Sequence, residues 1–306
     1  MRIIFFGTAE FGVPSLCLLH KHYTINCVIT NPDKPAGRGQ QLMISPIKKR
    51  ALELNIPIIQ PESLKDIQFI EYLDRLNPDI FVVVAFRILP PEVYKIAKHG
   101  AFNLHASLLP KYRGAAPIQW AIMNGENETG VTTFFLEETV DTGSIILQAR
   151  IPIGLDETAG ELHDRLAEVG AEVVLHTVRL IEIGKAKSIP QDASSSSKAP
   201  KILNEDCRIQ WKLDAASIHN FIRALSPKPG AFTFHKDIKL KIYRTKIIEK
   251  KSHRQPGEVI DVKKGLLIAT GQNAIEVLQI QKEGKKILPT EEFLHGYHIN
   301  IGDVFS

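Results

Sequence analysis

Runs of apolar residues alternate with amphipathic stretches over the first two thirds of the chain. The runs are short and rich in Ile, Val and Phe, which is typical of strands buried on both faces of a parallel sheet. The stretches between them repeat apolar residues at helical spacing. The predicted strands are residues 2–6, 24–30, 57–60, 80–85, 102–105, 130–137 and 144–153, and the predicted helices are 13–20, 45–54, 66–76, 92–98, 116–124 and 157–184. This alternation predicts an α/β fold with a Rossmann-like, mainly parallel, doubly wound sheet.

The last third of the chain has a different pattern. One predicted helix, 214–225, is followed by short strands with turns of Asp, Gly and Asn between them. The predicted strands are 231–235, 238–248, 257–262, 266–271 and 274–281. Such closely spaced strands favour a small OB-like β-barrel domain. A serine run, 194–197, lies between Pro190 and Pro200 without any apolar period, which is typical of a linker. We therefore predict a first domain over 1–188, a linker over 189–205 and a second domain over 206–306.

Composition narrows the class of protein. Of the 306 residues, 44% are hydrophobic and 24% are charged, which is ordinary for a globular protein with two packed cores. No apolar run approaches the roughly 18 residues that a membrane span needs, and the first residues lack the layout of a signal peptide. Cys17, Cys27 and Cys207 are too dispersed for a disulfide framework or a metal site. We expect a cytoplasmic, monomeric protein with no membrane segment.

Charge is unevenly distributed along the chain. The formal net charge is +4, but from residue 206 onward 17 Lys and Arg face 11 Asp and Glu, so this part carries +6 and the rest −2. Residues 236–254 alone hold eight basic side chains and two acidic ones. A solvated surface explains such a stretch about as often as a binding face does. The asymmetry nevertheless indicates a polyanionic partner for the C-terminal part.

A pair of polar residues stands where a short strand follows the apolar run 80–85. Asn103 and His105 are two positions apart, so their side chains share one face of that strand while Leu104 points into the core. An amide donor beside an imidazole suits carbonyl chemistry, because one group holds a developing oxyanion and the other moves a proton. A lone histidine at a strand end is more often structural, so the pair needs support from its surroundings.

That support comes from neighbouring motifs. Ser-Leu-Leu-Pro follows at 107–110, and Asp-Thr-Gly occurs later at 141–143. The whole set resembles the signature of the formyltetrahydrofolate-dependent formyltransferases. The resemblance implies that Asn103, His105 and Asp141 are catalytic and that the formyl donor is 10-formyltetrahydrofolate. It further implies a folate site lined by Ser107, Leu108, Leu109 and Pro110, with no metal.

Further motifs single out one branch of that family. They are Arg-Gly-Ala-Ala-Pro-Ile at 113–118, Glu-Thr-Gly-Val-Thr at 128–132, Asp-Lys-Pro-Ala-Gly-Arg-Gly at 33–39 and the extra C-terminal domain. They resemble the branch whose acceptor is methionine esterified to initiator tRNA. The resemblance implies tRNA contacts from Lys34, Arg38, Lys239, Lys241, Arg244 and Lys246. We expect residues 31–41, with two prolines and two glycines, to form an irregular loop. The sequence departs from the family at Arg87, where a small residue is usual near the folate site.

Four other interpretations remain open at this point. A sister formyltransferase acting on glycinamide ribonucleotide or an amino sugar, or a hydrolase passing the formyl group to water, would share Asn103, His105 and Asp141 but would not need the basic domain. A non-catalytic RNA-binding protein would need only that domain. The turn from Gly7 to Gly12 invites a dinucleotide site, but its spacing does not match the usual Gly-rich pattern.

Overall fold

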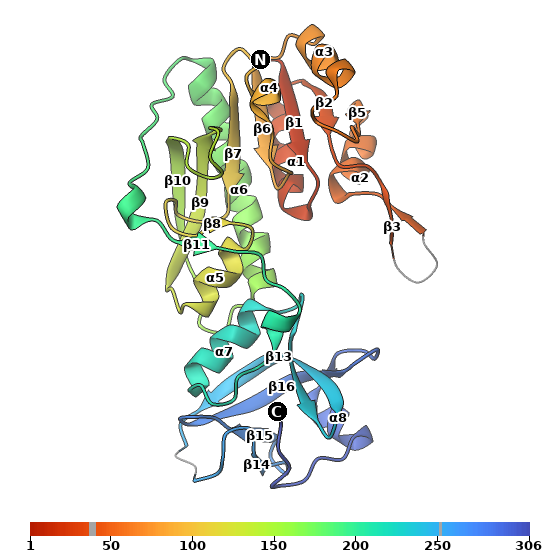
Figure 1. The fold of residues 1–306 in the computed structure, drawn as a ribbon, viewed down its shortest axis with the longest axis vertical. Coiled ribbons are helices and arrows are strands. Elements are labelled where there is room, and N and C mark those ends of the chain that lie inside the picture. Colours follow the sequence, from red (N-terminus) through yellow and green to blue (C-terminus); the bar gives the residue numbers. More distant parts are fainter. Residues whose placement is uncertain (37–40, 251–252) are drawn as a thin grey trace. The chain divides into compact units, whose positions relative to one another are not determined.

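The computed structural model describes residues 1–36, 41–250 and 253–306, which form two compact units (Figure 1). The first unit comprises Met1–Ala115, Thr129–Ile151 and His163–Ala199, and the second comprises Ala116–Glu128, Pro152–Leu162 and Pro200–Ser306. Each unit is therefore assembled from several segments, while the linear domain boundaries stay a prediction. Within the described ranges, no helix combines the length and the apolar composition that crossing a bilayer requires.

A seven-stranded sheet organises the first unit. Its strands are β1 (Ile3–Gly7), β2 (Ile25–Ile29), β5 (Ile58–Ile59), β6 (Ile80–Val84), β7 (Ala101–His105), β9 (Glu128–Phe135) and β10 (Ile145–Pro152). Their order is β10-β9-β7-β6-β1-β2-β5. The strands from β7 to β5 are parallel to their neighbours, and β9 runs antiparallel to β7. The predicted mainly parallel α/β sheet is confirmed.

Helices cover both faces of this sheet. They are α1 (Val13–His22), α2 (Pro46–Glu53), α3 (Ile67–Arg75), α4 (Pro91–Tyr94) and α6 (Ala159–Glu182), with a 3-10 turn η1 (Glu10–Gly12) before α1. Ser45 and Asp66 cap α2 and α3 by accepting from the backbone amides of Lys48 and Gln68. Every residue of β1 and of β6 is buried, as expected for central strands between two helical layers.

Two short strand pairs lie outside the main sheet. Strands β3 (Lys34–Ala36) and β4 (Gln41–Met43) pair antiparallel, and β8 (Arg113–Gly114) pairs parallel with β11 (Lys198–Ala199). The prediction of an irregular loop over 31–41 is therefore wrong for the described part of β3 and β4. Backbone pairing here does not depend on an apolar period, so the pattern of side chains did not reveal it.

In the second unit, α7 (Ala215–Ala224) and α8 (Thr290–Gly296) pack on an antiparallel sheet, and α5 (Pro117–Met123) packs on α7. The helices α5 and α7 and most strands are where the sequence predicts them, whereas α8 and β17 (Leu288–Pro289) were not predicted. The strands β12 (Ala231–His235), β13 (Ile238–Ile248), β16 (Ala274–Lys282), β15 (Leu266–Ala269) and β14 (Val259–Asp261) follow one another in the sheet, and β17 pairs with β16. Two short 3-10 turns complete the list of elements. The turn η2 (Ala193–Ser195) belongs to the first unit, and η3 (Glu205–Cys207) belongs to the second.

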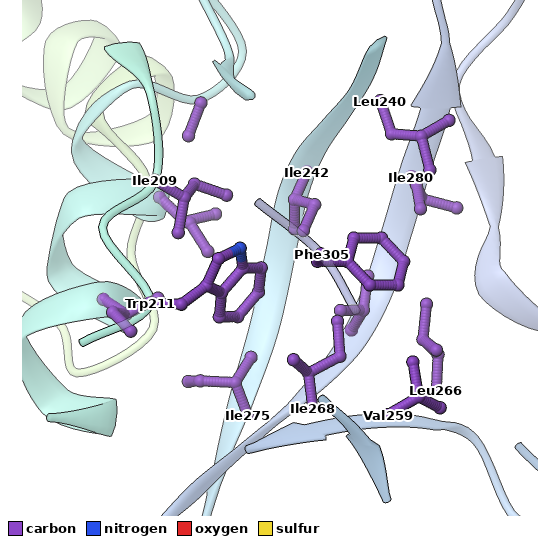
Figure 2. Close-up of a cluster of buried hydrophobic side chains, with 14 of the residues drawn as sticks. Ile209, Trp211, Leu240, Ile242, Val259, Leu266, Ile268, Ile275, Ile280 and Phe305 are labelled. Carbon is purple, nitrogen blue, oxygen red and sulfur yellow. The ribbon is translucent and has the colours of Figure 1, made fainter. Parts of the chain in front are cut away.

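The C-terminal residues close this sheet into a small barrel. Phe234 and Ser306 exchange two backbone hydrogen bonds, and the amide of Val259 donates to the carbonyl of Asp303. The chain end thus joins β12 to β14, the two edge strands, and leaves neither edge open. Figure 2 shows Phe305 and Trp211 inside the buried cluster of this unit, among isoleucine and leucine side chains from the strands. The predicted OB-like barrel is confirmed.

We predict that Phe305→Ala destabilises the second unit. The ring is 1% exposed, stacks on His235 and lies edge-on to Trp211, so its removal leaves a cavity that costs about 3–5 kcal/mol. Urea unfolding followed by tryptophan fluorescence measures the change, because Trp120 and Trp211 both belong to this unit.

The neighbouring Val304→Ala is the matched control. Its side chain is 41% exposed, so the free energy of unfolding should change by less than about 0.5 kcal/mol. Equal losses for the two variants would contradict the closure of the barrel by the C-terminal residues.

Candidate functional site

Strand β7 places the two residues singled out by the sequence. Leu104 is buried and faces α6 so closely that a Cβ on Gly170 would lie 2.7 Å from its Cδ2. Asn103 and His105 therefore share the opposite face. His105 is 6% exposed, and its Nε2 lies 2.8 Å from the carbonyl oxygen of Tyr112. Because a carbonyl only accepts, this bond assigns the ring hydrogen to Nε2 and leaves Nδ1 free to act as a proton acceptor.

Asp141 faces that free nitrogen. Its Oδ2 lies 3.9 Å from Nδ1 of His105 and accepts a hydrogen bond of 2.9 Å from the amide of Gly114. The separation from the imidazole is too long for a hydrogen bond, and a charge interaction arises only when the imidazole gains a proton. Asp141 has a left-handed backbone with φ of 57°, a conformation that Asp tolerates better than most residues. The carboxylate is thus aimed at His105 by the shape of its own turn.

Two glycines allow this turn to form. A Cβ on Gly143 would lie 1.7 Å from the carbonyl oxygen of Phe135, inside the space of that atom. Gly114 has φ of 127°, and a Cβ there would lie 2.6 Å from the carbonyl oxygen of Ala199. Any side chain at either position would push the backbone apart. The Asp-Thr-Gly motif therefore has a physical reason: glycine lets the turn lie against β9 while Asp141 points inward.

A cavity opens beside Asn103 and Asp141. Its lining residues are Val83, Phe86, Arg87, Ile88, Leu89, Asn103, Phe134, Leu136, Glu137, Glu138, Thr139, Val140 and Asp141. Apolar side chains from β6, β9 and their following loops form most of its wall, with the amide and the carboxylate at one place. Such a mixture fits a largely apolar ligand that carries a polar reacting group. Asn103 and Asp141 thus line one cavity, and Asp141 also lies beside His105, which is not among the lining residues.

Arg87 lies in the wall of the same cavity. Its guanidinium donates to the backbone carbonyls of Pro61 and Glu62, the latter at 3.0 Å. Its buried Nε has no hydrogen-bond partner among the described residues. Burial lowers the pKa of Arg87 from its ordinary value. The departure from the family noted in the sequence is thus a residue of this site.

The Ser-Leu-Leu-Pro segment is tied to the sheet rather than exposed in the cavity wall. Thr132 Oγ1 donates to the carbonyl of Ser107 and accepts from the amide of Leu109, at 2.6 and 3.1 Å. Gln148 Nε2 donates to the carbonyl of Leu109 at 2.9 Å. Ser107, Leu108, Leu109 and Pro110 are not among the residues that line the cavity. Their contact with folate stays a prediction.

Strand β13 carries four of the basic residues named above. Its pairing with β16 is irregular on both sides of Arg244, although the register before and after this point is the same. Leu240, Ile242 and Thr245 are buried, so the basic side chains lie on the other face. They are Lys239, Lys241, Arg244 and Lys246. The burial pattern of β13 changes parity at this irregularity, which places Arg244 and Lys246 on the same face as Lys239 and Lys241.

Several of these cations are held in place by neighbours. Lys239 Nζ lies 4.2 Å from the ring centre of Phe232, and Lys241 Nζ donates to the carbonyl of Pro229 at 2.7 Å. Arg244 forms an ion pair with Glu161, and Lys246 is exposed. Cation–π and ion-pair contacts at a surface contribute little energy, but they reduce the freedom of long side chains. The result is a basic strand face with ordered charges.

Lys34, another of the predicted basic residues, begins β3 of the hairpin, whereas Arg38 lies outside the described residues. At the base of the hairpin, Asp33 forms an ion pair with Lys48 and accepts from Gln60 Nε2 at 2.9 Å. These bonds, chiefly that from Lys48, lower the pKa of Asp33. The hairpin is thus anchored to α2 at its base.

In the described part of the chain, no three His, Cys, Asp or Glu side chains gather closely enough to hold a metal ion.

The sequence was then compared with known proteins. The family model for formyl transferase matches residues 1–178, and that for the formyl transferase C-terminal domain matches residues 201–298. The methionyl-tRNA formyltransferase of Alkaliphilus oremlandii is 45% identical over 309 residues, covering 100% of both chains. That of Thermodesulfovibrio yellowstonii is 46% identical over 307 residues, covering 99% of each. The chain belongs to the methionyl-tRNA formyltransferase family. It is a formyltransferase, and the family predicted from its motifs is confirmed.

Solved structures of other formyltransferases share this fold. WlaRD, a sugar 3N-formyl transferase, is 25% identical with a TM-score of 0.68 and covers 94% of this chain and 99% of its own. Phosphoribosylglycinamide formyltransferase from Streptococcus pneumoniae, at 21% identity and a TM-score of 0.51, matches 59% of this chain over 98% of its own. The match to this enzyme therefore leaves about two fifths of the present chain without a counterpart.

Sequence reasoning missed residues that act through backbone contacts. The amide of Gly114, the hydroxyl of Thr132 and the side chain of Gln191 each hold a loop of the site. No periodic pattern marks them. The nearest signals were the positions of Gly114 inside the Arg-Gly-Ala-Ala-Pro-Ile motif and of Thr132 at the end of the Glu-Thr-Gly-Val-Thr motif.

We predict that Gly143→Ala abolishes most activity of this formyltransferase. The added methyl group overlaps the carbonyl oxygen of Phe135, so the turn must move and carry Asp141 away from His105. A displacement of about 1 Å in a catalytic group costs on the order of 100-fold in rate. Steady-state kinetics with saturating substrates provides the measurement.

Gly184→Ala is a suitable control, because Gly184 also lies in a turn of the first unit but has open space around it. Its φ of 66° makes the change mildly strained, so a small loss of stability with full activity is expected. Normal turnover of Gly143→Ala would contradict the packing of the turn.

Proposed function

We propose that this formyltransferase transfers a formyl group from 10-formyltetrahydrofolate to the amino group of methionine carried by initiator tRNA. The observation that carries the proposal is the convergence of Asn103, His105 and Asp141 beside one cavity. It is supported by relatives of nearly equal length that are named methionyl-tRNA formyltransferases. A similar solved structure, HypX from Aquifex aeolicus, is in complex with tetrahydrofolic acid. A monomeric state and a cytoplasmic location stay predictions.

The proposed chemistry gives each of the three groups a separate role. The free amine attacks the formyl carbon, and the carbonyl oxygen becomes an oxyanion that the Asn103 amide stabilises by donating a hydrogen bond. Nδ1 of His105 accepts the proton that the amine loses, since its other nitrogen already donates to Tyr112. The carboxylate of Asp141 stabilises the imidazolium that results. The bond between the carbon and the folate nitrogen then breaks, and His105 passes the proton to that nitrogen.

The cavity beside Asn103 is our proposed site for the folate head group. Its apolar wall, with Phe134, Val83 and Leu89, suits the faces of a flat heterocycle. Ser107, Leu108, Leu109 and Pro110 would lie along the part of the donor nearer to His105, since they follow it in the chain. Water must be kept from the formyl carbon, because the same groups would otherwise catalyse its hydrolysis.

We propose that the basic face of β13 and the hairpin of β3 and β4 bind the tRNA. Lys239, Lys241, Arg244 and Lys246 present positive charge at successive positions of one strand face, which suits contacts to phosphates without sequence readout. Lys34 at the start of β3 is a further proposed tRNA contact, and so is Arg38, which lies outside the described residues.

We predict that Asn103→Ala, His105→Ala and Asp141→Asn each lower kcat by at least about 100-fold, the usual range for an oxyanion donor or a general base. The assay supplies 10-formyltetrahydrofolate and methionyl-tRNA, with glycinamide ribonucleotide and buffer alone as alternative acceptors. The dissociation constant for tRNA should not change, because none of the three residues lies in a basic surface.

Ser194→Ala serves as the control, because the Ser194 side chain is exposed and bonds only to Asp192. The proposal fails if formyl groups reach glycinamide ribonucleotide or water but not methionyl-tRNA. Near-normal kcat in the three variants would remove the catalytic assignment even if tRNA is the acceptor.

We predict that the double variant Lys239→Glu, Lys241→Glu weakens tRNA binding and flattens its salt dependence. Each lost phosphate contact removes about one from the slope of log K against log salt. Filter binding at salt concentrations between about 50 and 200 mM measures this slope.

Lys263→Glu, Lys264→Glu is the matched control. These residues are exposed and lie in the turn between β14 and β15, so the variant makes the same change in net charge away from β13. If both double variants reduce the slope equally, net charge rather than the basic face governs binding.

A further inference from the structure

Residues 189–199, which follow α6 after a short connection, hold two loops of the site, the turn of Asp141 and the loop of Arg113. We name this segment the strap. Its backbone at Ile189 pairs with Ile145 at one end, and β11 pairs with β8 at the other. The composition of the segment predicted a linker. In the structure it belongs to the first unit.

Gln191 makes the central contacts of the strap. Its Nε2 donates to the carbonyl of Asp141 at 2.9 Å and to the carbonyl of Gly143 at 2.8 Å. Its Oε1 accepts from Arg113 Nε at 3.1 Å and from Arg113 Nη2 at 2.7 Å. Both donors of the amide are used, and its oxygen receives a two-pronged bond from a guanidinium. One side chain thus joins the turn of Asp141 to the loop of Arg113.

The C-terminal part of the strap holds the loop that supplies the hydrogen-bond partner of His105. Ser197 Oγ accepts from the amide of Tyr112, and the carbonyl of Ser197 accepts from the amide of Arg113, both at 2.9 Å. The carbonyl of Tyr112 is the partner of His105 Nε2. The strap therefore supports both the acceptor that orients the imidazole and the turn that presents the carboxylate.

We propose that Gln191 is a positioning residue for formyl transfer, acting through Asp141. Its two donated bonds fix the carbonyls on either side of Thr142, which leaves the turn little freedom to rotate the carboxylate away from His105. The left-handed backbone of Asp141 makes such support necessary, because the turn has no regular secondary structure to hold it. The inference rests on the proposed catalytic role of Asp141.

Gln191→Glu tests the donated bonds. The glutamate still accepts from Arg113, but it has no N–H for the carbonyls of Asp141 and Gly143. We expect kcat with methionyl-tRNA to fall roughly 10- to 100-fold, as for a small misplacement of a catalytic group. KM for tRNA and the midpoint of thermal unfolding should stay close to those of the parent protein. Gln191→Leu, of similar size, should give the same loss, and Ser194→Ala in the same strap should give none.

A double-mutant cycle with Asp141→Asn separates positioning from general structural damage. If Gln191 acts through Asp141, adding Gln191→Glu to Asp141→Asn should change kcat by less than about twofold, because the orienting contact has nothing left to orient. An equal loss in both backgrounds would overturn the inference. So would parent-like kcat for Gln191→Glu.

Amide hydrogen exchange gives a readout that does not need activity. The Gly114 amide donates to the Asp141 carboxylate, so a displaced turn exposes it and exchange of the 112–118 segment should quicken in Gln191→Glu. Unchanged exchange there would overturn the inference even if activity falls. Normal kcat for Asp141→Asn would instead contradict the proposed function. The exchange result would still show whether Gln191 holds the turn.

Discussion

The direction of β9 sets the central constraint on this site. Because β9 runs antiparallel to β7, its residue opposite His105 is Thr132, and its last residue, Phe135, lies opposite Phe102. The chain therefore leaves β9 three residues away from the imidazole, about 10 Å along the strand. Asp141 reaches His105 only because the segment after Phe135 folds back toward it. The close contacts of this turn hold it in that folded-back position.

The return makes specific demands on side chains and backbone. The turn must approach β9 more closely than a Cβ permits, which requires Gly143, and it must aim a carboxylate inward, which requires the left-handed backbone of Asp141. A largely buried carboxylate needs donors, and the amide of Gly114 supplies one. The strap then holds the turn from outside. A catalytic group at the end of a regular strand, like His105, needs far less support than one carried by a loop.

This difference decides how much of the site could be predicted from the sequence. Asn103 and His105 follow from strand periodicity, which also located most strands and helices but none of the short strands β3, β4, β8, β11 and β17. Asp141 was found only through a resemblance, because no periodic pattern brings its turn to β7. Gln191 was hidden in a segment without apolar period, since hydrogen bonds to carbonyls leave no mark on hydrophobic pattern. The same reason accounts for β3 and β4, which were expected to be irregular.

The basic face of β13 shows the opposite case, in which the core fixes a functional surface. Without the irregularity at Arg244, the parity that buries Leu240 and Ile242 would also bury Arg244 and Lys246. Burying two cations without partners costs far more than a local irregularity in the strand pairing. Packing and solvation within the barrel therefore favour the irregularity at Arg244. The basic side chains consequently share one face before any polyanion binds, so binding does not require the strand to rearrange. They are Lys239, Lys241, Arg244 and Lys246.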